Sequence, residues 1–320
     1  MSGTVLILAS PDDGEARRVG VELRRRGQRF ALLDLSWFPQ RMTLTGELTP
    51  SGWESQIVTP DGALPLADIT SVYQRRCPPF EPPEGMNDTE RRFSLVEARF
   101  GLGGVLMSLP AHWVSHPTAM ADAEYKPFQL AAARRAGLSV PETWIGNDPV
   151  SARAFVSTLG NGGAVYKPLM HKLVTDQSVG KVIYTSLAAA EDVDDRVSTT
   201  AHLFQARVGA EHDVRALVTS RSCAAVAIRA RRGRAFLDYR DHYDALTYER
   251  TSLPADVLTG AQRMLANLGL AAGVCDFAVT TAGETVFYEV NPAGQWAWLE
   301  EETGAPMTRL ICDELTGAAP

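Results

Sequence analysis

The residues best suited to chemistry lie near the end of the chain, in a predicted β-hairpin. Val274–Val279 and Val286–Pro292 are rich in β-branched and aromatic residues, and the turn residues Thr281–Glu284 lie between them. A turn centred in the middle of these four residues places Asp276 directly opposite Glu289. Two carboxylates that face each other across a hairpin repel and destabilise it, so this pair requires an explanation.

A divalent cation would explain the pair. Asn291 follows Glu289 by two residues on the same strand, so its side chain emerges on the same face. Hard oxygen ligands without a nearby His or Cys are typical of Mg²⁺, which proteins hold with one or two carboxylates and substrate phosphates. The alternative is a solvated outer face on which two acids happen to oppose. We favour a magnesium site formed by Asp276, Glu289 and Asn291, because Pro292 ends the strand directly after the Asn.

Two lysines could provide the positive charge that nucleotide phosphates require. Lys126 opens a predicted helix, and Lys167 lies in a short apolar strand, Val165–Pro168. Lys167 is either an edge-strand residue whose charge reaches solvent or a buried cation that awaits an anion. With an acidic metal site downstream, we favour phosphate binding by both lysines. The polar stretch His171–Lys181 could fold over the phosphates, although it is not a Walker motif.

Two predicted strands place an arginine two residues after an aspartate. The pairs are Asp213 with Arg215 and Asp238 with Arg240. Such pairs are usually surface ion pairs of little energetic value. Beside a metal site, these arginines could instead hold a carboxylate or an acyl phosphate through two hydrogen bonds.

A run of arginines flanks Gly233 in a further predicted turn. Such a run is usually a solvated turn, but it could attract an acidic partner. His242 beside Tyr243 is more often structural. The arginines of the run are Arg229, Arg231, Arg232 and Arg234.

The composition is that of an ordinary globular protein. The chain has 320 residues, 45% hydrophobic and 22% charged, which is enough for two or three domains. A net charge of −7 gives no indication of nucleic-acid or membrane partners. The four cysteines lack metal-binding spacing, and the apolar start, Val5–Ala9, is too short for a signal peptide. We therefore expect a cytoplasmic protein whose cysteines are reduced and buried.

The N-terminal part is predicted to be a doubly wound α/β domain. Residues 4–9 form a continuous apolar run that is typical of a strand buried on both faces. A helix at Glu15–Arg26 and a strand at Phe30–Leu33 complete a βαβ unit. Ser10–Gly14 lacks the G-x-G-x-x-G pattern, which excludes a dinucleotide fingerprint. A further helix is expected at Asp88–Met107.

The remainder predicts mixed helices and antiparallel strands. Asp148 as N-cap and Pro149 in the first turn mark one helix start, and Gly269 marks one helix end. The expected helices begin at Lys126, Asp148 and Pro254, and after Pro306. The expected strands are Glu142–Ile145, Val165–Pro168, Val182–Thr185, Leu203–Gln205, Asp213–Val218, Ala224–Ile228 and Ala235–Tyr239.

Several short motifs, taken in this order, resemble a known family over nearly the whole chain. They are Tyr73–Arg76, Ser115–Pro117, Gly137–Thr143, Asn147–Pro149, Asp238–Arg240 and Glu289–Trp296. With the early Lys, the strand Lys and the acidic hairpin, this order resembles the ATP-grasp ligases. More specifically it is similar to the microviridin-type graspetide synthetases, which are ATP-grasp ribosomal peptide maturases. The chain departs from that pattern at Tyr73 and Tyr239, where the family usually has Trp.

The resemblance implies a fold and a division into domains. The expected fold is α/β (α+β), an ATP-grasp fold with an N-terminal doubly wound pre-ATP-grasp domain. That domain is expected at residues 1–117, the central ATP-grasp subdomain at 118–203, and the C-terminal subdomain with the Mg²⁺ site at 204–320. A homo-oligomer, namely a dimer, is the expected assembly.

The resemblance also implies a reaction that uses ATP and Mg²⁺. A side-chain carboxylate of a ribosomal precursor peptide, which consists of a leader and an acidic, Thr-rich core, takes the γ-phosphoryl group of ATP. A hydroxyl or amine of the same peptide then attacks the acyl phosphate and closes an ester or amide ring.

The implied roles of single residues follow from this reaction. Lys126 and Lys167 would neutralise the phosphates, and Arg215 and Arg240 would steady the acyl phosphate and the oxyanion. The general base is open, with His242 and Asp238 as candidates. The residues expected around adenine and ribose are Phe204, Gln205, Val208 and Glu211.

Two other functions remain open on the sequence. One is an ATP-grasp carboxylate–amine ligase that acts on a free amino acid or another small carboxylate. The other is a nucleotide-binding protein without catalysis, against which the intact set of Asp276, Glu289 and Asn291 argues.

Overall fold

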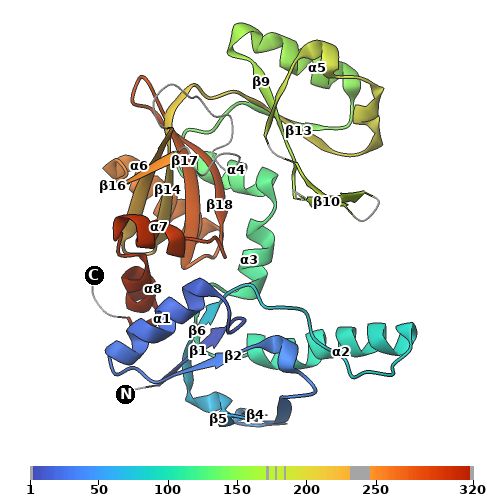
Figure 1. The fold of residues 1–320 in the computed structure, drawn as a ribbon, viewed down its shortest axis with the longest axis vertical. Helices are drawn as coiled ribbons and strands as arrows, with labels where there is room; N and C mark the ends of the chain where they lie inside the picture. Colours follow the sequence, from blue (N-terminus) through green and yellow to red (C-terminus); the bar gives the residue numbers. More distant parts are fainter. Residues whose placement is uncertain (1–2, 171–172, 177–178, 184, 231–245, 318–320) are drawn as a thin grey trace.

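The computed structural model describes residues 3–170, 173–176, 179–183, 185–230 and 246–317. These residues form an N-terminal α/β domain, a central antiparallel sheet, and a C-terminal antiparallel sheet (Figure 1). The expected mixture of α and β structure is confirmed. Among the helices so described, none is both long enough and apolar enough to cross a bilayer.

The N-terminal domain is built on a parallel sheet with the strand order β2-β1-β6-β7. Alternate residues of β1 point to opposite faces: Val5 and Ile7 belong to the same core cluster as α1, and Leu6 and Leu8 to the same cluster as α2. The predicted doubly wound sheet is therefore confirmed. Its elements are β1 Thr4–Leu8, α1 Gly14–Arg25, β2 Phe30–Leu33, β6 Ile69–Gln74, α2 Asp88–Met107 and β7 His112–Val114.

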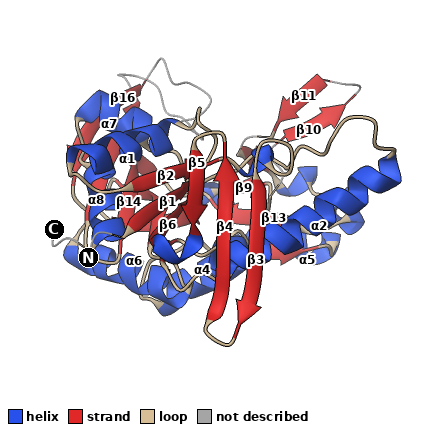
Figure 2. Ribbon diagram, turned by 90° about the horizontal axis from the view of Figure 1, so that it is seen from below, coloured by secondary structure: helices blue, strands red, loops and turns tan. Residues whose placement is uncertain are grey.

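A three-stranded antiparallel meander is inserted between β2 and β6 (Figure 2). The inserted elements are β3 Thr43–Thr49, β4 Gly52–Thr59 and β5 Gly62–Pro65, with short 3₁₀ turns at Leu35–Trp37 and Leu66–Asp68.

The predicted helix α2 runs through Gly101–Gly104 without a break. It begins with a capping box in which Asn87 and Glu90 each accept a backbone hydrogen bond.

The central sheet has the order β12-β9-β13-β8, and α5 covers one of its faces. Asp148 accepts hydrogen bonds from the backbone of Val150 and Ser151, which confirms it as the N-cap of α5. The elements are β8 Thr143–Gly146, α5 Pro149–Thr158, β9 Ala164–Lys167, β12 Ser186–Ala188 and β13 His202–Ala206, with 3₁₀ turns at Gly160–Gly162, Ala190–Asp192 and Asp195–Thr199.

The strand predicted at Val182–Thr185 is wrong, because one strand ends at Val182 and the next, β12, begins at Ser186. The residues before it form a separate hairpin of β10 Leu173–Asp176 and β11 Val179–Val182, and β9 pairs with β12 instead. The polar stretch predicted as a loop therefore contains two strands.

The C-terminal sheet has five antiparallel strands in the order β16-β15-β14-β17-β18. The helix predicted from Pro254 is α6, and it ends before Gly269, which has a φ of 69°. The elements are β14 Ala210–Thr219, β15 Cys223–Ala230, β16 Leu246–Thr251, α6 Ala255–Asn267, β17 Ala272–Thr280, β18 Thr285–Asn291, α7 Ala297–Thr303 and α8 Met307–Thr316. The strand predicted at Ala235–Tyr239 lies outside the described residues.

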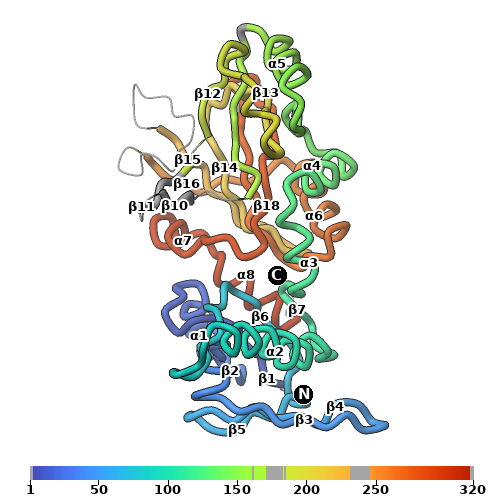
Figure 3. Tube along the Cα trace, turned by 90° about the vertical axis from the view of Figure 1, so that its right-hand side faces the viewer, coloured from blue at the N-terminus to red at the C-terminus, as the bar shows by residue number. Residues whose placement is uncertain are grey.

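Both faces of the C-terminal sheet are covered. Two earlier helices, α3 Pro117–Ala123 and α4 Lys126–Arg135, pack with α6 against one face, in a cluster that includes Phe277 and Phe287. The other face meets α8, which lies between this sheet and the N-terminal domain (Figure 3). One core cluster therefore joins α1, α8 and both sheets.

The sheets refine the predicted domain boundaries. The expected boundary between 203 and 204 falls inside β13, which pairs with the central strands β8 and β9. The central sheet therefore extends to Ala206. Helix α4, which was expected in the central subdomain, packs on the C-terminal sheet instead.

All four cysteines are free thiols, as expected. Cys275 and Cys312 are buried, whereas Cys77 and Cys223 are half-buried. Burial raises the pKa of Cys77, Cys223 and Cys312 to about 12, so these thiols stay protonated at neutral pH.

Close packing behind the hairpin yields a stability prediction. A Cβ atom on Gly273 of β17 would lie 2.6 Å from Cγ2 of Val290 and 3.0 Å from Cδ2 of Leu265. We expect Gly273→Ala to destabilise the protein by about 1–3 kcal/mol through overpacking. Gly104→Ala is the control: an added Cβ there meets nothing within 4 Å, and Ala in an exposed helix should stabilise by about 0.5–1 kcal/mol. Denaturant midpoints that move in the same direction in both variants would contradict this account.

Candidate active site

The predicted hairpin is formed by β17 and β18, and Asp276 lies opposite Glu289. The path to this pairing differs from the prediction. Near the turn, Val279 faces Thr285, and Gly283 takes a positive φ of 82° that Gly adopts readily. A β-bulge that leaves Tyr288 without a facing residue then shifts the register by one position. Turn and bulge compensate each other, so the two carboxylates still face each other.

Each of the two carboxylates has a cationic partner. Nη1 of Arg215 donates to both carboxylate oxygens of Asp276 at 2.8 Å, and Arg215 faces Asp276 from the neighbouring strand β14. Nζ of Lys126 donates to Oε2 of Glu289. The four side chains are between 11% and 17% exposed, so these ion pairs lie close to the protein interior. The two cations offset the repulsion that the sequence indicated.

Helix α4 is fixed on β18 by a buried glutamine. Nε2 of Gln129 donates to the carbonyl of Val290 at 2.9 Å, and its Oε1 accepts from the backbone N–H of Val290 at 3.0 Å. The same Nε2 also donates to the carbonyl of Ala123. Because Lys126 lies one turn before Gln129, this clamp sets Lys126 beside Glu289. The sequence contained one sign of it, a polar residue on the apolar face of α4.

The hairpin offers a set of oxygen donors that suits Mg²⁺. Nδ2 of Asn291 lies 3.4 Å from Oδ2 of Asp276, so the two side chains meet as expected. A reversed amide would turn the Asn oxygen toward the same space. Two carboxylates and one amide are hard ligands of the kind that hold Mg²⁺ together with phosphates. The described residues contain no group of three or more His, Cys, Asp and Glu that could hold a metal ion. This site has only two carboxylates, and its third candidate ligand is the amide of Asn291.

Lys167 reaches from the central sheet to the hairpin. Its Nζ lies 4.3 Å from the centre of the Tyr288 ring, a cation–π contact between β9 and β18. Burial raises the pKa of Tyr288, so the phenol is neutral. Since Tyr288 precedes Glu289, the contact brings the charge of Lys167 near the acidic pair, between the two sheets.

The strand β13 separates two residues that were expected to contact adenine. Phe204 is 5% exposed and packs against Trp144 and Tyr166 in the core under α5. Its side chain lies in that core, and its backbone pairs with Trp144 and Tyr166. Gln205 faces Val165 of β9, so it shares a face with Lys167. Gln205 is itself held by a hydrogen bond to Oγ1 of Thr143 at 2.9 Å.

The two remaining nucleotide candidates lie where β13 leads into β14. Val208 is half-buried, and its carbonyl accepts from the N–H of Ala210 at 2.9 Å. Glu211 is exposed and forms an ion pair with Arg229 of β15 at 3.1 Å. A ribose hydroxyl would therefore meet a carboxylate that is already held in place.

Several candidates from the sequence cannot be placed. The catalytic candidate Arg240 and the possible bases Asp238 and His242 lie outside the described residues. The same holds for Arg231, Arg232 and Arg234 of the arginine run.

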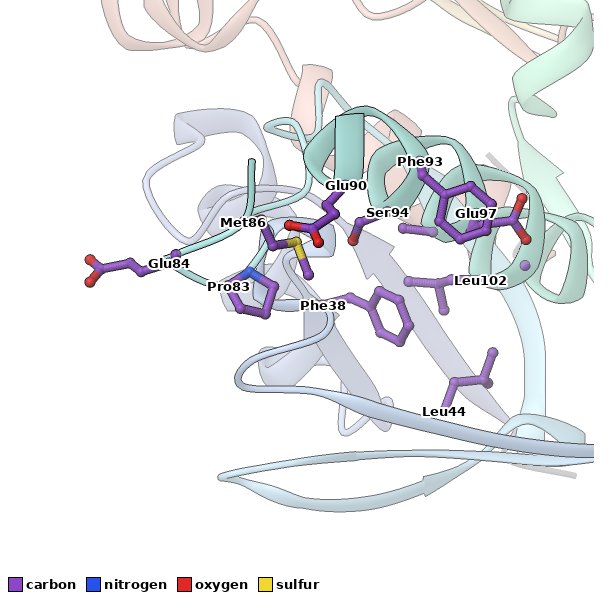
Figure 4. A pocket seen from close by; sticks show the side chains of 13 residues that line it. Phe38, Leu44, Pro83, Glu84, Met86, Glu90, Phe93, Ser94, Glu97 and Leu102 are labelled. Carbon is purple, nitrogen blue, oxygen red and sulfur yellow. The ribbon is translucent and has the colours of Figure 1, made fainter. Parts of the chain in front are cut away.

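A cavity of about 830 Å³ lies elsewhere, beneath α2 in the N-terminal domain (Figure 4). Phe38, Met86 and Leu102 contribute to its largely apolar lining, with Glu90 and Glu97 beside them. All lining residues belong to the first 102 positions, so this cavity is separate from the hairpin.

Comparison with known proteins places this geometry in a family. The family model of the MvdD pre-ATP grasp domain matches residues 4–121. The macrocyclase MdnB from Microcystis aeruginosa MRC is 26% identical, with a TM-score of 0.78 over 98% of this chain and 99% of that chain. The chain has the fold of the ATP-grasp ligases. The fold and the resemblance to graspetide synthetases that the sequence indicated are both confirmed.

Two further solved structures match this chain over nearly its whole length. A RiPP-associated ATP-grasp ligase from Chryseobacterium gregarium, in complex with ADP and a leader and core peptide, has a TM-score of 0.90 at 22% identity, over 99% of this chain and 98% of that chain. The ATP-grasp ligase PsnB, complexed with minimal precursor, Mg and ADP, has a TM-score of 0.78 at 24% identity, over 98% of this chain and 96% of that chain. No curated protein sequence matches the chain significantly.

The position of Lys167 gives a direct test of the nucleotide site. We expect Lys167→Met to weaken ATP binding by about 10- to 100-fold, because it removes one charge-assisted contact and keeps the apolar stem. Isothermal titration calorimetry would measure the affinity, and the thermal midpoint should stay nearly constant. Arg134→Met, on the exposed last turn of α4, should leave ATP binding unchanged. Equal ATP affinity in the Lys167 variant and the wild type would show that the nucleotide lies elsewhere.

Proposed function

We propose that this ATP-grasp ligase phosphorylates a side-chain carboxylate of a ribosomal precursor peptide and then closes an ester or amide ring within that peptide. The observation that carries the proposal is the hairpin with Asp276 and Glu289 as facing carboxylates, toward which Lys167 extends from a second sheet. Similar ligases with bound ADP and precursor peptides support the substrate class.

The metal would be held by Asp276, Glu289 and Asn291. Bound there, Mg²⁺ would neutralise and orient the phosphates of ATP. Lys126 and Arg215 keep both carboxylates at defined positions, which lowers the cost of organising the site. Lys167 provides a further positive charge on the side of the central sheet, where ATP would enter between the two sheets.

The two chemical steps balance without an added reactant. In the first, a carboxylate oxygen of the peptide attacks the γ-phosphorus, and ADP leaves. In the second, a hydroxyl or amine attacks the acyl carbon, loses its proton, and phosphate leaves. Positive charge is needed at the acyl phosphate oxygens and at the developing oxyanion. We propose Arg215 and Arg240 for this task, with Lys126 and Lys167 at the phosphates.

Arg215 already has two tasks. Its Nε and Nη2 donate to the carbonyl of Gln295 at 3.1 and 3.0 Å, and its Nη1 holds Asp276. A planar guanidinium held in this way is preorganised, so little side-chain entropy is lost when it meets an anion.

A small free carboxylate is the main rival substrate. The pre-ATP-grasp domain of the MvdD type and the peptide complexes of similar ligases support the peptide instead. A purely regulatory nucleotide-binding role is less consistent with an intact set of metal ligands on a fold that these ligases share. A homodimer remains a proposal, which light scattering of the purified protein would test.

The substrate class is tested by incubation of the protein with ATP, Mg²⁺ and acidic, Thr-rich precursor peptides. We expect ADP and phosphate as products, and a peptide mass lower by one water for each ring. Without Mg²⁺ the reaction should stop, because the phosphate charge is then not neutralised. ADP release with free amino acids and unchanged peptides would favour the small-substrate ligase. AMP as the product would exclude the acyl-phosphate route.

The metal ligands are tested by Glu289→Gln. We expect a loss of turnover of at least about 100-fold, as for the removal of other preorganised electrostatic groups. The substitution removes one charge of a like-charge pair but also leaves Lys126 without its carboxylate partner, so the thermal midpoint is measured to confirm that the variant is folded at the assay temperature. Glu284→Gln in the exposed turn of the same hairpin is the matched control and should keep full activity. Full activity of Glu289→Gln would remove this residue from the site.

A further inference from the structure

A buried arginine of the N-terminal domain contacts the segment that follows the active-site hairpin. Arg75, at the end of β6, is 3% exposed. Its Nη1 donates to the carbonyl of Gly294 at 3.2 Å, and its Nη2 donates to Oε2 of Glu15 at 3.0 Å. Its Nε donates to both carboxylate oxygens of Asp13 at 3.3 Å. The guanidinium thus joins α1, β6 and the C-terminal segment.

Glu15 contacts the same segment from its other end. Its Oε1 accepts from the backbone N–H groups of Trp296 and Ala297, at 2.8 and 3.1 Å. Glu15 is 5% exposed, so these charge-assisted hydrogen bonds are shielded from water. Arg75 and Glu15 therefore bind the backbone of Gly294–Ala297 on both sides of Gln295.

The carbonyl between these contacts belongs to the active site. Gln295 accepts two hydrogen bonds from Arg215, which in turn holds Asp276. The segment has little freedom to move: the N–H of Gly294 donates to the carbonyl of Asn291 at 3.0 Å, and a Cβ on Gly294 would lie 2.7 Å from Cβ of Val274. A change in the backbone at Gln295 would therefore be transmitted to Arg215.

We propose that Arg75 and Glu15 are positioning residues for the active site. They fix the backbone of Gly294–Ala297, so that the carbonyl of Gln295 holds Arg215 against Asp276. The proposal rests on the proposed function in one respect, namely that Asp276 binds the metal that accompanies ATP. It gives the pre-ATP-grasp domain a part in the organisation of the metal site.

A purely structural role and a positioning role of Arg75 predict different effects when Arg75 is replaced. If Arg75 only joins two domains, its loss lowers the thermal midpoint and leaves the metal site unchanged. If it positions Arg215, its loss also changes how strongly Mg²⁺ increases the affinity for ADP. That increase, the ratio of ADP affinities with Mg²⁺ and with EDTA, needs no peptide substrate. It therefore remains measurable even if the peptide reaction is not found.

The test uses Arg75→Lys, which keeps the charge and loses the planar fork, and Glu15→Gln, which keeps the acceptor for Trp296. Calorimetry should show the Mg²⁺-dependent increase in ADP affinity reduced by about 10-fold in each folded variant, as when the partner of a metal ligand is altered. Arg17→Lys is the control, since Arg17 lies on the same helix as Glu15 but forms a solvent-exposed ion pair with Asp12, which precedes the helix. It should behave like the wild type.

A double-mutant cycle with Arg215→Lys identifies the route. If Arg75 acts through Arg215, Arg75→Lys should have little further effect in the Arg215→Lys background. Additive losses would overturn the proposal, as would a wild-type Mg²⁺ effect in both Arg75→Lys and Glu15→Gln. Should Arg75→Lys fail to fold, Glu15→Gln decides alone. If the wild type shows the Mg²⁺ effect but no peptide reaction, the proposed function fails while this inference stands.

Discussion

The active site depends on the charge balance between two carboxylates that the β-pairing forces together. Asp276 and Glu289 face each other across β17 and β18, so neither strand can relieve the repulsion by itself. Relief comes from elsewhere: Arg215 extends from β14, and Lys126 from the first turn of α4. The hairpin is therefore stable in this form only when the rest of the sheet and α4 are in place.

The four charged groups are held in place before a ligand binds. Removing one partner of an ion pair in a mostly buried position leaves a charge without compensation, which favours keeping all four groups together. The cations themselves are held by neutral groups, Arg215 by the carbonyl of Gln295 and α4 by the buried Gln129. Charges that are fixed before the ligand arrives need not be reorganised during the reaction.

Local signals in the sequence predicted most of the fold. The apolar run of β1, Asp148 followed by Pro149, and Gly269 after α6 each act within one turn or strand, and the structure has the elements that they indicate. The facing of Asp276 and Glu289 was likewise visible, because a hairpin brings residues of nearby sequence together.

Features that depend on contacts between distant parts of the chain could not be predicted from the sequence. Phe204 and Gln205 are adjacent, and which of them faces a ligand depends on α5, which covers one side of the central sheet. The bulge at Tyr288 has no signature in the sequence. The predicted facing pair was nevertheless correct, because the turn is centred on Ala282, slightly earlier than predicted, and this offset compensates the bulge. The contact between Lys126 and Glu289 joins positions 163 residues apart. The sequence likewise revealed the motif that contains Arg75 but not its contacts with Glu15 and Gly294.

The position of α8 has a consequence for how the protein is made. Its buried residues Leu310 and Ile311 complete the core cluster that contains Val5 and Ile7 of β1. Arg26, at the end of α1, also forms an ion pair with Asp313 of α8, 287 positions later. Helix α1 covers this face early, but the part of the core that α8 contacts must stay exposed while the ribosome synthesises the intervening chain. Domains usually fold in the order of synthesis. Here the core of the first domain is complete only after α8 has been synthesised. The apolar surface that is exposed until then is a natural site for a chaperone to bind.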